Sequence, residues 1–313
     1  MHPAYSVILF TTTSGAGYGL LALLGFTAAT EAALSPVAAL ISLALALGLI
    51  TFGLLASTFH LGRPERAWRA LSQWRSSWLS REGVLAVATY VPALGLGFLW
   101  LTGQETAWLL ALVGVLAGVL AVLTVVATGM IYASLKTIRQ WNHPLVVPAY
   151  LCFALAGGGT LFLMFASFSG VVGLVHWIIP VVGLLLTLLL TLFYWHSIDR
   201  QPRDLDAAAA TGLSDFGQVR QWESAHTADN YVQREMGYQV ARRHAARLRR
   251  LTVLGIALSL LFVIVSALLS GLPAALSALL AALLLFTASL VQRWLFFAQA
   301  EHIVNLYYGA QRA

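Results

Sequence analysis

The sequence predicts an all-α integral membrane protein with eight transmembrane helices. Its mean hydropathy is +0.82, and only 10% of its 313 residues are charged, whereas an ordinary soluble domain has roughly 25%. Its apolar runs are long enough to cross a hydrocarbon core of ~30 Å, which takes about 20 helical residues. These runs lack the alternation of apolar and polar residues that a membrane β-barrel strand requires. Residues 1–313 are therefore expected to form a single membrane domain.

Eight apolar runs define the expected helices in order. The first begins at the end of the stretch MHPAYS, which has no lysine or arginine. This run is longer than the ~7 to 15 apolar residues of a secretion signal. Pro36 lies where the second run begins and Pro144 where the fifth begins, because proline fits the start of a helix. Gly271 and Pro273 divide the last apolar block into two crossings. The expected helices cover residues 6–29, 34–58, 82–101, 106–134, 145–167, 173–196, 251–270 and 272–294.

The basic residues are confined to one side of the expected membrane. With eight crossings, both termini share a side with the second, fourth and sixth connections, and all 18 Lys and Arg residues fall there. The only charged residues of the opposite connections are Glu31 and Glu105. Because basic residues are enriched on the cytoplasmic side of membrane proteins, both termini are predicted to be cytoplasmic. We expect a multi-pass protein of a bacterial inner membrane, in contact with its lipids.

The sixth connection, residues 197–250, is the only sizeable polar segment. Its last part, residues 228–250, has the composition of a helix that leads into the seventh crossing, with its basic end at the lipid headgroups. Two interpretations are compatible with this pattern. The segment is either a lipid-anchoring basic collar or a docking surface for a cytoplasmic partner, and both can hold together.

The second connection, residues 59–81, concentrates the polar chemistry of the chain. His60 is expected in the last turn of the second helix, and Gly62 has the position of the glycine that follows a helix end. Pro64 then begins an amphipathic helix at the membrane interface. Ser80 is expected to cap the third helix, with Glu82 in its first turn. These two helix ends would bring His60 and Glu82 to a similar depth.

His60 and Glu82 each have an ordinary explanation, since both complement a helix dipole for ~0.3 to 1 kcal/mol. An ionisable residue at a helix end that faces the bundle costs free energy unless it is paired. An imidazole and a carboxylate together form a pair that can exchange protons. A quinone needs an apolar slot, a hydrogen-bond donor to a carbonyl oxygen and a proton-exchanging group. We therefore predict a quinone site in which His60 is the donor and Glu82 exchanges protons. Weaker candidates are Gly62 and three arginines that would pair with Glu82 or contact a partner, namely Arg63, Arg66 and Arg81.

The first expected helix contains a run of small and polar residues, FTTTSGAGYG, over residues 10–19. Most such runs are packing seams between membrane helices. The alternative is that Thr11, Ser14 and Tyr18 line the quinone slot beside His60.

A haem b site is a second possibility at the same edge. Its candidate ligands are His60, His143 and His196, but bis-histidine ligation requires two imidazoles that face each other across a bundle core. No expected helix has a histidine near its middle. The single cysteine, Cys152, excludes a disulfide framework and a thiolate cluster for a metal. We therefore expect no metal site formed by this chain, and a haem is not favoured.

Other functional classes lack their sequence signatures. The chain has no Walker A loop, GxSxG elbow, HExxH helix or nucleic-acid-binding module, so a hydrolase or a nucleic-acid partner is not expected. A transporter usually has ionisable residues near the middle of the bilayer and broken inverted repeats, and neither pattern is visible. A purely structural membrane anchor stays open.

Two motifs in the second connection resemble a known family. The pattern A-S-x-x-H-L-G-x-P-x-R-A at residues 56–67, followed by S-x-L-S-x-E at residues 77–82, is similar to the membrane anchor subunit of dimethyl sulfoxide reductase complexes, the DmsC family. The resemblance implies a non-catalytic subunit of an oxidoreductase complex that holds a molybdopterin catalytic subunit and a four-cluster iron–sulfur subunit at the membrane. It also implies electron exchange with ubiquinone or menaquinone, and it implicates the positions of His60 and Glu82 in the quinol site.

Two further features resemble one branch of that family. The WRSSWLSREG version of the loop, residues 74–83, and the arginine-rich sixth connection are similar to the SoeC-type anchors of cytoplasmic sulfite-oxidising complexes. This likeness implies that electrons pass from sulfite, through the iron–sulfur subunit docked on residues 197–250, to the quinone pool. The alternatives are a quinol-oxidising anchor of a reductase and an anchor that bears haem b.

Overall fold

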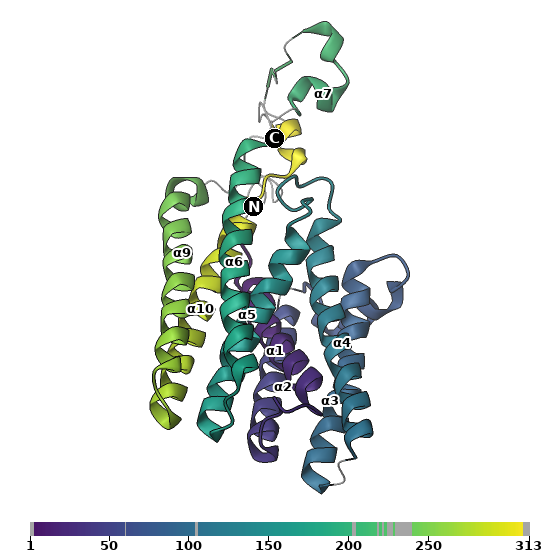
Figure 1. The fold of residues 1–313 in the computed structure, drawn as a ribbon. Coiled ribbons are helices and arrows are strands. Elements are labelled where there is room, and N and C mark those ends of the chain that lie inside the picture. The colour runs from purple at the N-terminus through teal and green to yellow at the C-terminus, as the bar shows by residue number, and fades with distance from the viewer. Residues whose placement is uncertain are drawn as a thin grey trace.

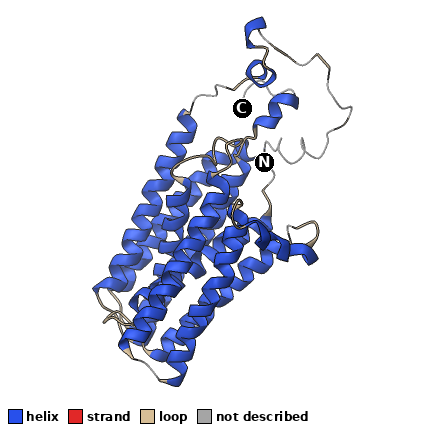
Figure 2. Ribbon diagram, turned by 90° about the vertical axis from the view of Figure 1, so that its right-hand side faces the viewer, coloured by secondary structure: helices blue, strands red, loops and turns tan. Residues whose placement is uncertain are grey.

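The protein is an α-helical bundle in the computed structural model (Figure 1). The structure describes residues 3–59, 61–103, 106–201, 205–217, 219–220, 222–223, 228 and 240–308, and these residues form no strand beyond one isolated bridge between Ile138 and His302 (Figure 2). Eight described helices are long and apolar enough to cross a membrane, which confirms the predicted fold class. They are α1 Tyr5–Thr27, α2 Pro36–Thr58, α3 Trp78–Thr102, α4 Ala107–Ala133, α5 Val146–Ser169, α6 Leu174–Arg200, α9 Val240–Ala267 and α10 Gly271–Ala298.

The helices form two groups of four that meet along α1 and α5. In the first group α1 packs against α2 and α4, and in the second α5 packs against α6 and α10. The two groups are joined because α1 also packs against α5. As a result α1 lies in the middle of the bundle and is its most enclosed helix (Figure 1).

Glycines allow α1 and α5 to cross at very short distance. A Cβ atom on Gly19 would lie 1.8 Å from the carbonyl oxygen of Ala154, and one on Gly158 would lie 2.2 Å from the carbonyl carbon of Gly19. No side chain larger than hydrogen fits at either position without moving the backbone. The polar run of the first helix is therefore a packing seam at Gly19, as one of its two interpretations predicted.

One end of the bundle carries both chain termini, and we call it the terminal end (Figure 1). The C-terminal segment, which includes the 3₁₀ helix η3 (Ile303–Tyr308), is fastened to the connection between α4 and α5. The indole N–H of Trp141 donates to the carbonyl oxygen of Phe296 at 2.9 Å. The backbone N–H of Ile303 donates to the carbonyl oxygen of Thr137 at 3.1 Å. Connections far apart in the sequence thus form one layer over this end.

The second connection differs in detail from its prediction. A helix does begin at Pro64, but it is the 3₁₀ helix η1, Pro64–Gln73. The helix α2 already ends at Thr58, so exposed Gly62 does not follow its end directly, and that prediction was wrong. The residue that caps α2 is Phe59, in the right-handed conformation, so the turn needs no glycine.

The third helix begins earlier than expected. It starts at Trp78 rather than at residue 82, and its N-cap residue is Ser77. Ser80 is therefore not a cap: its hydroxyl donates to the carbonyl oxygen of Ala70 in η1, which ties the connection to α3. Glu82 consequently lies in the second turn of α3, one turn deeper in the bundle than the sequence suggested.

The other helix boundaries agree with the sequence. The last apolar block is divided between α9, which ends at Ala267, and α10, which begins at Gly271. Of the segment 228–250 that was expected to lead into the seventh crossing, residues 240–250 are helical and form the first part of α9, whereas residues 229–239 lie outside the described residues.

Candidate functional site

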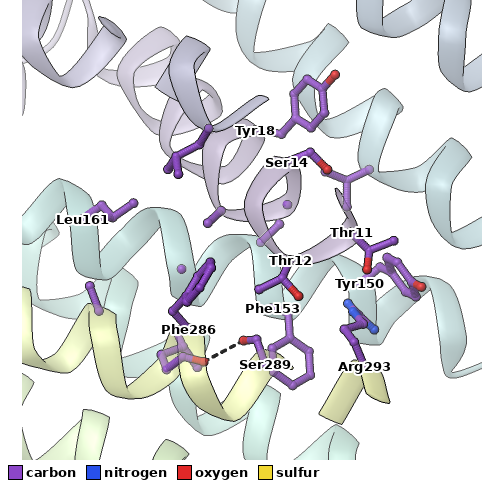
Figure 3. A pocket seen from close by; sticks show the side chains of 18 of the residues that line it. Thr11, Thr12, Ser14, Tyr18, Tyr150, Phe153, Leu161, Phe286, Ser289 and Arg293 are labelled. Carbon is purple, nitrogen blue, oxygen red and sulfur yellow. Dashed lines mark hydrogen bonds between the residues drawn. The ribbon is translucent and has the colours of Figure 1, made fainter. Parts of the chain in front are cut away.

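A cavity of about 310 Å³ lies between α1, α5 and α10 (Figure 3). These helices supply most of its lining, α2 adds Leu45 and Leu49, and α4 adds Val125 and Thr128. The cavity therefore joins both groups of helices. It is lined mainly by apolar side chains with a few polar ones, which is the usual character of a site for a small organic ligand.

The charged and aromatic polar groups of the cavity gather towards the terminal end. With a helical rise of 1.5 Å per residue, Tyr150, Thr128 and Arg293 lie about 6 to 8 Å from that end of α5, α4 and α10. Met164 and Leu279 line the other end of the cavity. They lie about 27 to 29 Å from the terminal end along α5 and α10. The cavity thus has a polar head near one membrane surface and an apolar body that extends across the bilayer.

Glu82 lies behind the cavity wall. Its side chain is only 4% exposed and is the sole buried carboxylate in the part of the chain that the structure describes. The hydroxyl of Thr128 donates to Glu82 Oε1 and also lies 3.0 Å from the carbonyl oxygen of Thr124. Because Thr128 lines the cavity, one hydroxyl separates the carboxylate from any bound molecule. A carboxylate so placed can exchange protons with a ligand.

Several hydroxyls of the cavity have no partner. Thr12, Tyr18 and Tyr150 line it, their oxygens are buried, and among the described residues they make no hydrogen bond. Thr11 and Ser14 also line it, but their hydroxyls donate to carbonyl oxygens of their own helix at 2.9 and 2.6 Å. Buried polar groups without partners are rare and cost stability. A ligand with polar oxygens would supply the missing partners.

Arg293 is a residue of this site that the sequence alone did not single out. It is 3% exposed and is the only buried arginine or lysine within the described ranges. Its guanidinium carbon lies 3.6 Å from the centroid of the Tyr150 ring and 5.1 Å from that of Phe153. In the sequence it is one of the basic residues that set the sidedness of the chain. The signal that could have found it is its position within the expected helix 272–294, where an ionisable residue is a functional candidate.

The predicted slot residues do line this cavity, but no described residue of the second connection does. Thr11, Ser14 and Tyr18 face the cavity from α1 (Figure 3). His60 lies outside the described residues. Gly62 is exposed and lines no described cavity.

The three candidate arginines do not pair with Glu82. Arg63 and Arg66 are exposed, and Arg66 Nε lies 3.9 Å from Oε1 of the adjacent Glu65. Arg81 donates to the carbonyl oxygens of Trp74 and Arg75 at 3.0 and 2.8 Å. The expected pairing with Glu82 is therefore replaced by its contact with Thr128. Since successive helical residues point about 100° apart, Arg81 faces the connection while Glu82 faces the bundle.

Of the haem candidates, the structure describes His143 and His196, and these two do not face each other across the core of the bundle. His143 Nε2 lies 2.8 Å from Ser197 Oγ, and the backbone N–H of Leu145 donates to His143 Nδ1 at 3.2 Å, so both ring nitrogens are occupied. His196 is exposed on α6. Burial lowers the pKa of His143, which favours the neutral ring that accepts this hydrogen bond. A haem bound by His143 would have to break one of the two contacts. Within the described residues no group of His, Cys, Asp and Glu is arranged to hold a metal ion.

Comparisons with known proteins extend over the whole chain. The family described as DMSO reductase anchor subunit (DmsC) matches residues 1–309. The chain is also 33% identical over 329 aligned residues to a sulfite dehydrogenase subunit of Allochromatium vinosum, and the alignment covers 98% of this chain and 99% of the relative. Both matches agree with the similarity of the motifs at residues 56–67 and 77–82 to the DmsC family. The protein is therefore a multi-pass membrane anchor of a molybdoenzyme complex, and it belongs to the DmsC family.

Proposed function

We propose that this anchor binds a quinone and reduces it with electrons from a cytoplasmic molybdoenzyme that oxidises sulfite. The name of the Allochromatium vinosum relative supports sulfite as the electron donor. The electrons would reach the quinone from an iron–sulfur subunit, since this chain has one cysteine and no described metal site. The quinone would be ubiquinone or menaquinone.

The observation that carries the proposal is the match between the cavity and an amphiphile with a ring. A quinone has two carbonyl oxygens on a flat ring and a long isoprenoid tail. The ring would lie near Thr128 and near Tyr150, whose hydroxyl needs a partner. The tail would follow the apolar part, past Leu161 and Met164. Exposed Leu279 and Leu283 of α10 line this part, so the tail could leave the cavity towards lipid.

Glu82 is the proposed proton-exchanging group. Reduction of a quinone to a quinol takes two electrons and two protons, so the site needs a path from water to the ring. Glu82 lies about 6 Å from the start of α3 at the terminal end and contacts the cavity wall through Thr128. His60 remains the proposed donor to a quinone carbonyl.

The terminal end is the proposed docking surface of the iron–sulfur subunit and, through it, of the molybdopterin subunit. Exposed aromatic side chains lie there on η1, where Trp68 is 67% exposed, and directly after η1, where Trp74 is 53% exposed. Exposed aromatic residues of this kind are enriched at protein interfaces. The sixth connection, residues 197–250, would contribute its arginines. This end would face the cytoplasm of a bacterial cell, as the distribution of basic residues predicts.

The substitution Glu82→Gln in the intact complex tests the proposal. General acid–base groups contribute about 10²- to 10⁴-fold to rate, so sulfite-driven quinone reduction should fall by at least about 100-fold. Sulfite oxidation with an artificial electron acceptor should be unchanged, because it does not need the anchor. The matched control is Glu65→Gln, an exposed carboxylate of the second connection. Unchanged quinone reduction in the Glu82 variant would sink the assignment.

The reverse direction is the second candidate function, because the matching family is named for a reductase. The same cavity would then bind a quinol and release its protons. Co-purification of the native complex and identification of its large subunit decides between sulfite oxidation and reduction of an S-oxide. A reduced-minus-oxidised spectrum of the same preparation tests the haem b alternative, since an absorption band of haem would contradict a quinone-only anchor.

A further inference from the structure

We infer that Arg293 is an oxyanion-binding residue, which makes the cavity selective for a ligand with a negatively charged oxygen at one end of an apolar body. The inference that this ligand is a deprotonated, reduced form of the quinone rests on the proposed function. The anion selectivity itself rests only on the surroundings of Arg293.

Arg293 is a buried cation without a counter-charge among the described residues. At 3% exposure it is almost removed from solvent, and it forms no ion pair with any acidic side chain that the structure describes. Leaving a charge buried and unpaired is strongly destabilising. In the membrane-spanning part of the bundle such a residue is normally retained for function.

Arg249 is a second arginine whose surroundings can be compared with those of Arg293. It also lies over an aromatic ring at the terminal end, 5.2 Å from the centroid of Trp195. Unlike Arg293, however, Arg249 forms an ion pair with Asp199, with a shortest N–O distance of 2.5 Å. The comparison indicates that the missing counter-charge of Arg293 is specific to the cavity.

The ring contacts of Arg293 hold its guanidinium group in place without accepting hydrogen bonds from it. The ring of Tyr150, 3.6 Å away, stabilises the positive charge through a cation–π contact. An aromatic face, however, accepts no conventional hydrogen bond from the five N–H donors of a guanidinium group. The rings of Tyr150 and Phe153 therefore position the group and leave its donors available to a ligand.

The guanidinium group of Arg293 also points in a direction that suits a ligand in the cavity. Arg293 lines the cavity, and its guanidinium extends from α10 towards Thr11 and Tyr150 (Figure 3). The unpartnered hydroxyls of Thr12 and Tyr150 belong to the same cavity. An oxyanion there would be held by the guanidinium and by these hydroxyls. Its apolar body would lie against side chains such as Phe286 and Leu161.

Arg293 and Glu82 would then divide the chemistry of quinone reduction between them. The two electrons from the reduced iron–sulfur subunit place negative charge on the ring oxygens before two protons complete the quinol. Arg293 stabilises that charge from α10, whereas Glu82 supplies protons through Thr128 on α4. The two groups approach the cavity from different helices, so they can serve the two oxygens of one ring.

The experiment compares two naphthoquinones of nearly the same shape, one with a ring hydroxyl that is ionised at neutral pH and one without it. Binding of each to the purified, intact complex is measured by equilibrium dialysis for the native protein and for Arg293→Gln. A hydrogen bond to a charged group predicts a loss of about 10- to 100-fold for the anionic compound. The neutral compound should lose less than about 3-fold, within the effect of one uncharged hydrogen bond.

Two further variants separate a binding role from a structural one. Arg293→Lys should restore much of the preference for the anionic compound, because it keeps the positive charge. Glu31→Gln changes one exposed charge at the opposite end of the bundle, outside the cavity, and it should leave both affinities unchanged. Equal losses for both naphthoquinones in Arg293→Gln would overturn the inference. If that variant fails to assemble, the native complex decides: its affinity for the hydroxylated compound must rise as the hydroxyl ionises, and a constant affinity overturns the inference.

A third ligand distinguishes the failure of this inference from that of the proposed function. A twelve-carbon fatty acid carries an oxyanion on an apolar chain but is not a quinone. Arg293-dependent binding of the fatty acid, without binding of either naphthoquinone, would support the oxyanion role and overturn the quinone proposal. Binding of both naphthoquinones without any dependence on Arg293 would have the opposite meaning.

Discussion

The second connection and the cavity both contain arginine, and they use it in opposite ways. Arg63, Arg66, Arg69 and Arg75 are exposed on the connection. Exposed arginines near lipid headgroups cost little, and they fix the sidedness of a membrane protein. Arg293 is a single residue, but it is buried beside unpartnered hydroxyls. The difference teaches that the environment of a basic residue, rather than the local number of such residues, identifies a functional site in a membrane protein.

The largest predicted difference is in the loss of stability when a methyl group is added to the bundle or to the second connection. A glycine can be replaced by alanine in both regions. Gly19→Ala places a methyl group 1.8 Å from the backbone oxygen of Ala154, so α1 and α5 must separate. We expect a loss of at least about 3 kcal/mol of stability, at the upper end of overpacking effects. The measurement is thermal unfolding of the purified subunit in detergent.

The matched control is Gly62→Ala in the second connection, where an added Cβ meets no atom within 4 Å. Its stability should change by less than about 0.5 kcal/mol, as for ordinary surface substitutions. Equal effects at Gly19 and Gly62 would contradict the close crossing of α1 and α5.

A smaller effect on stability is expected when the pH is lowered. It involves the layer of connections over the terminal end. Burial lowers the pKa of His143 and His302, and the Nδ1 atom of each accepts a backbone N–H, at 3.2 and 3.0 Å. Because the pKa is lower in the folded state, the unfolded state binds more protons as the pH falls through about 6.5. The contribution of these residues to stability is therefore complete above that pH and is lost below it.

The corresponding measurement is the melting temperature between pH 7.5 and 5. It should decrease on acidification, and His143→Gln should make the decrease shallower. A decrease of the same steepness in the variant would show that His143 does not contribute to the pH dependence.

The smallest effects are predicted for single arginines of the second connection. In Arg63→Gln and Arg66→Gln the KM for quinone should change by less than about 2-fold, as expected for exposed residues that do not contact the cavity. Steady-state quinone reduction by the intact complex measures this. A tenfold increase in KM would place the ring near the connection and would remove the contrast on which the assignment of Arg293 depends.

The fold was predictable because a membrane crossing is a local property of the sequence. Apolar runs of about 20 residues identify helices without knowledge of their neighbours, and all eight expected crossings are present. The start of α3 was not predictable in the same way, because it depends on the contact between Ser80 and Ala70 in another element. Such tertiary contacts leave no periodic signal in the sequence.

The site was predictable only in part, for the same reason. Local polarity identified Thr11, Ser14 and Tyr18, which line the cavity. Arg293 was missed because its burial depends on α5 and on the continuation of α10 to Ala298, beyond the expected end at residue 294. The proximity of His60 to Glu82 stays a prediction, since His60 lies outside the described residues.

The cavity also bears on how the protein is made. Its walls come from α1 and from α10, which are the first and the last of these eight crossings to be synthesised. The hydroxyl-rich face of α1 therefore has no complete enclosure until α10 has been inserted. A chain whose synthesis stops before α10 lacks Arg293 and one wall of the cavity, although it retains Glu82 and the motifs of the second connection. Ligand occupancy thus requires all eight crossings, and it can serve as a marker that α10 has been inserted.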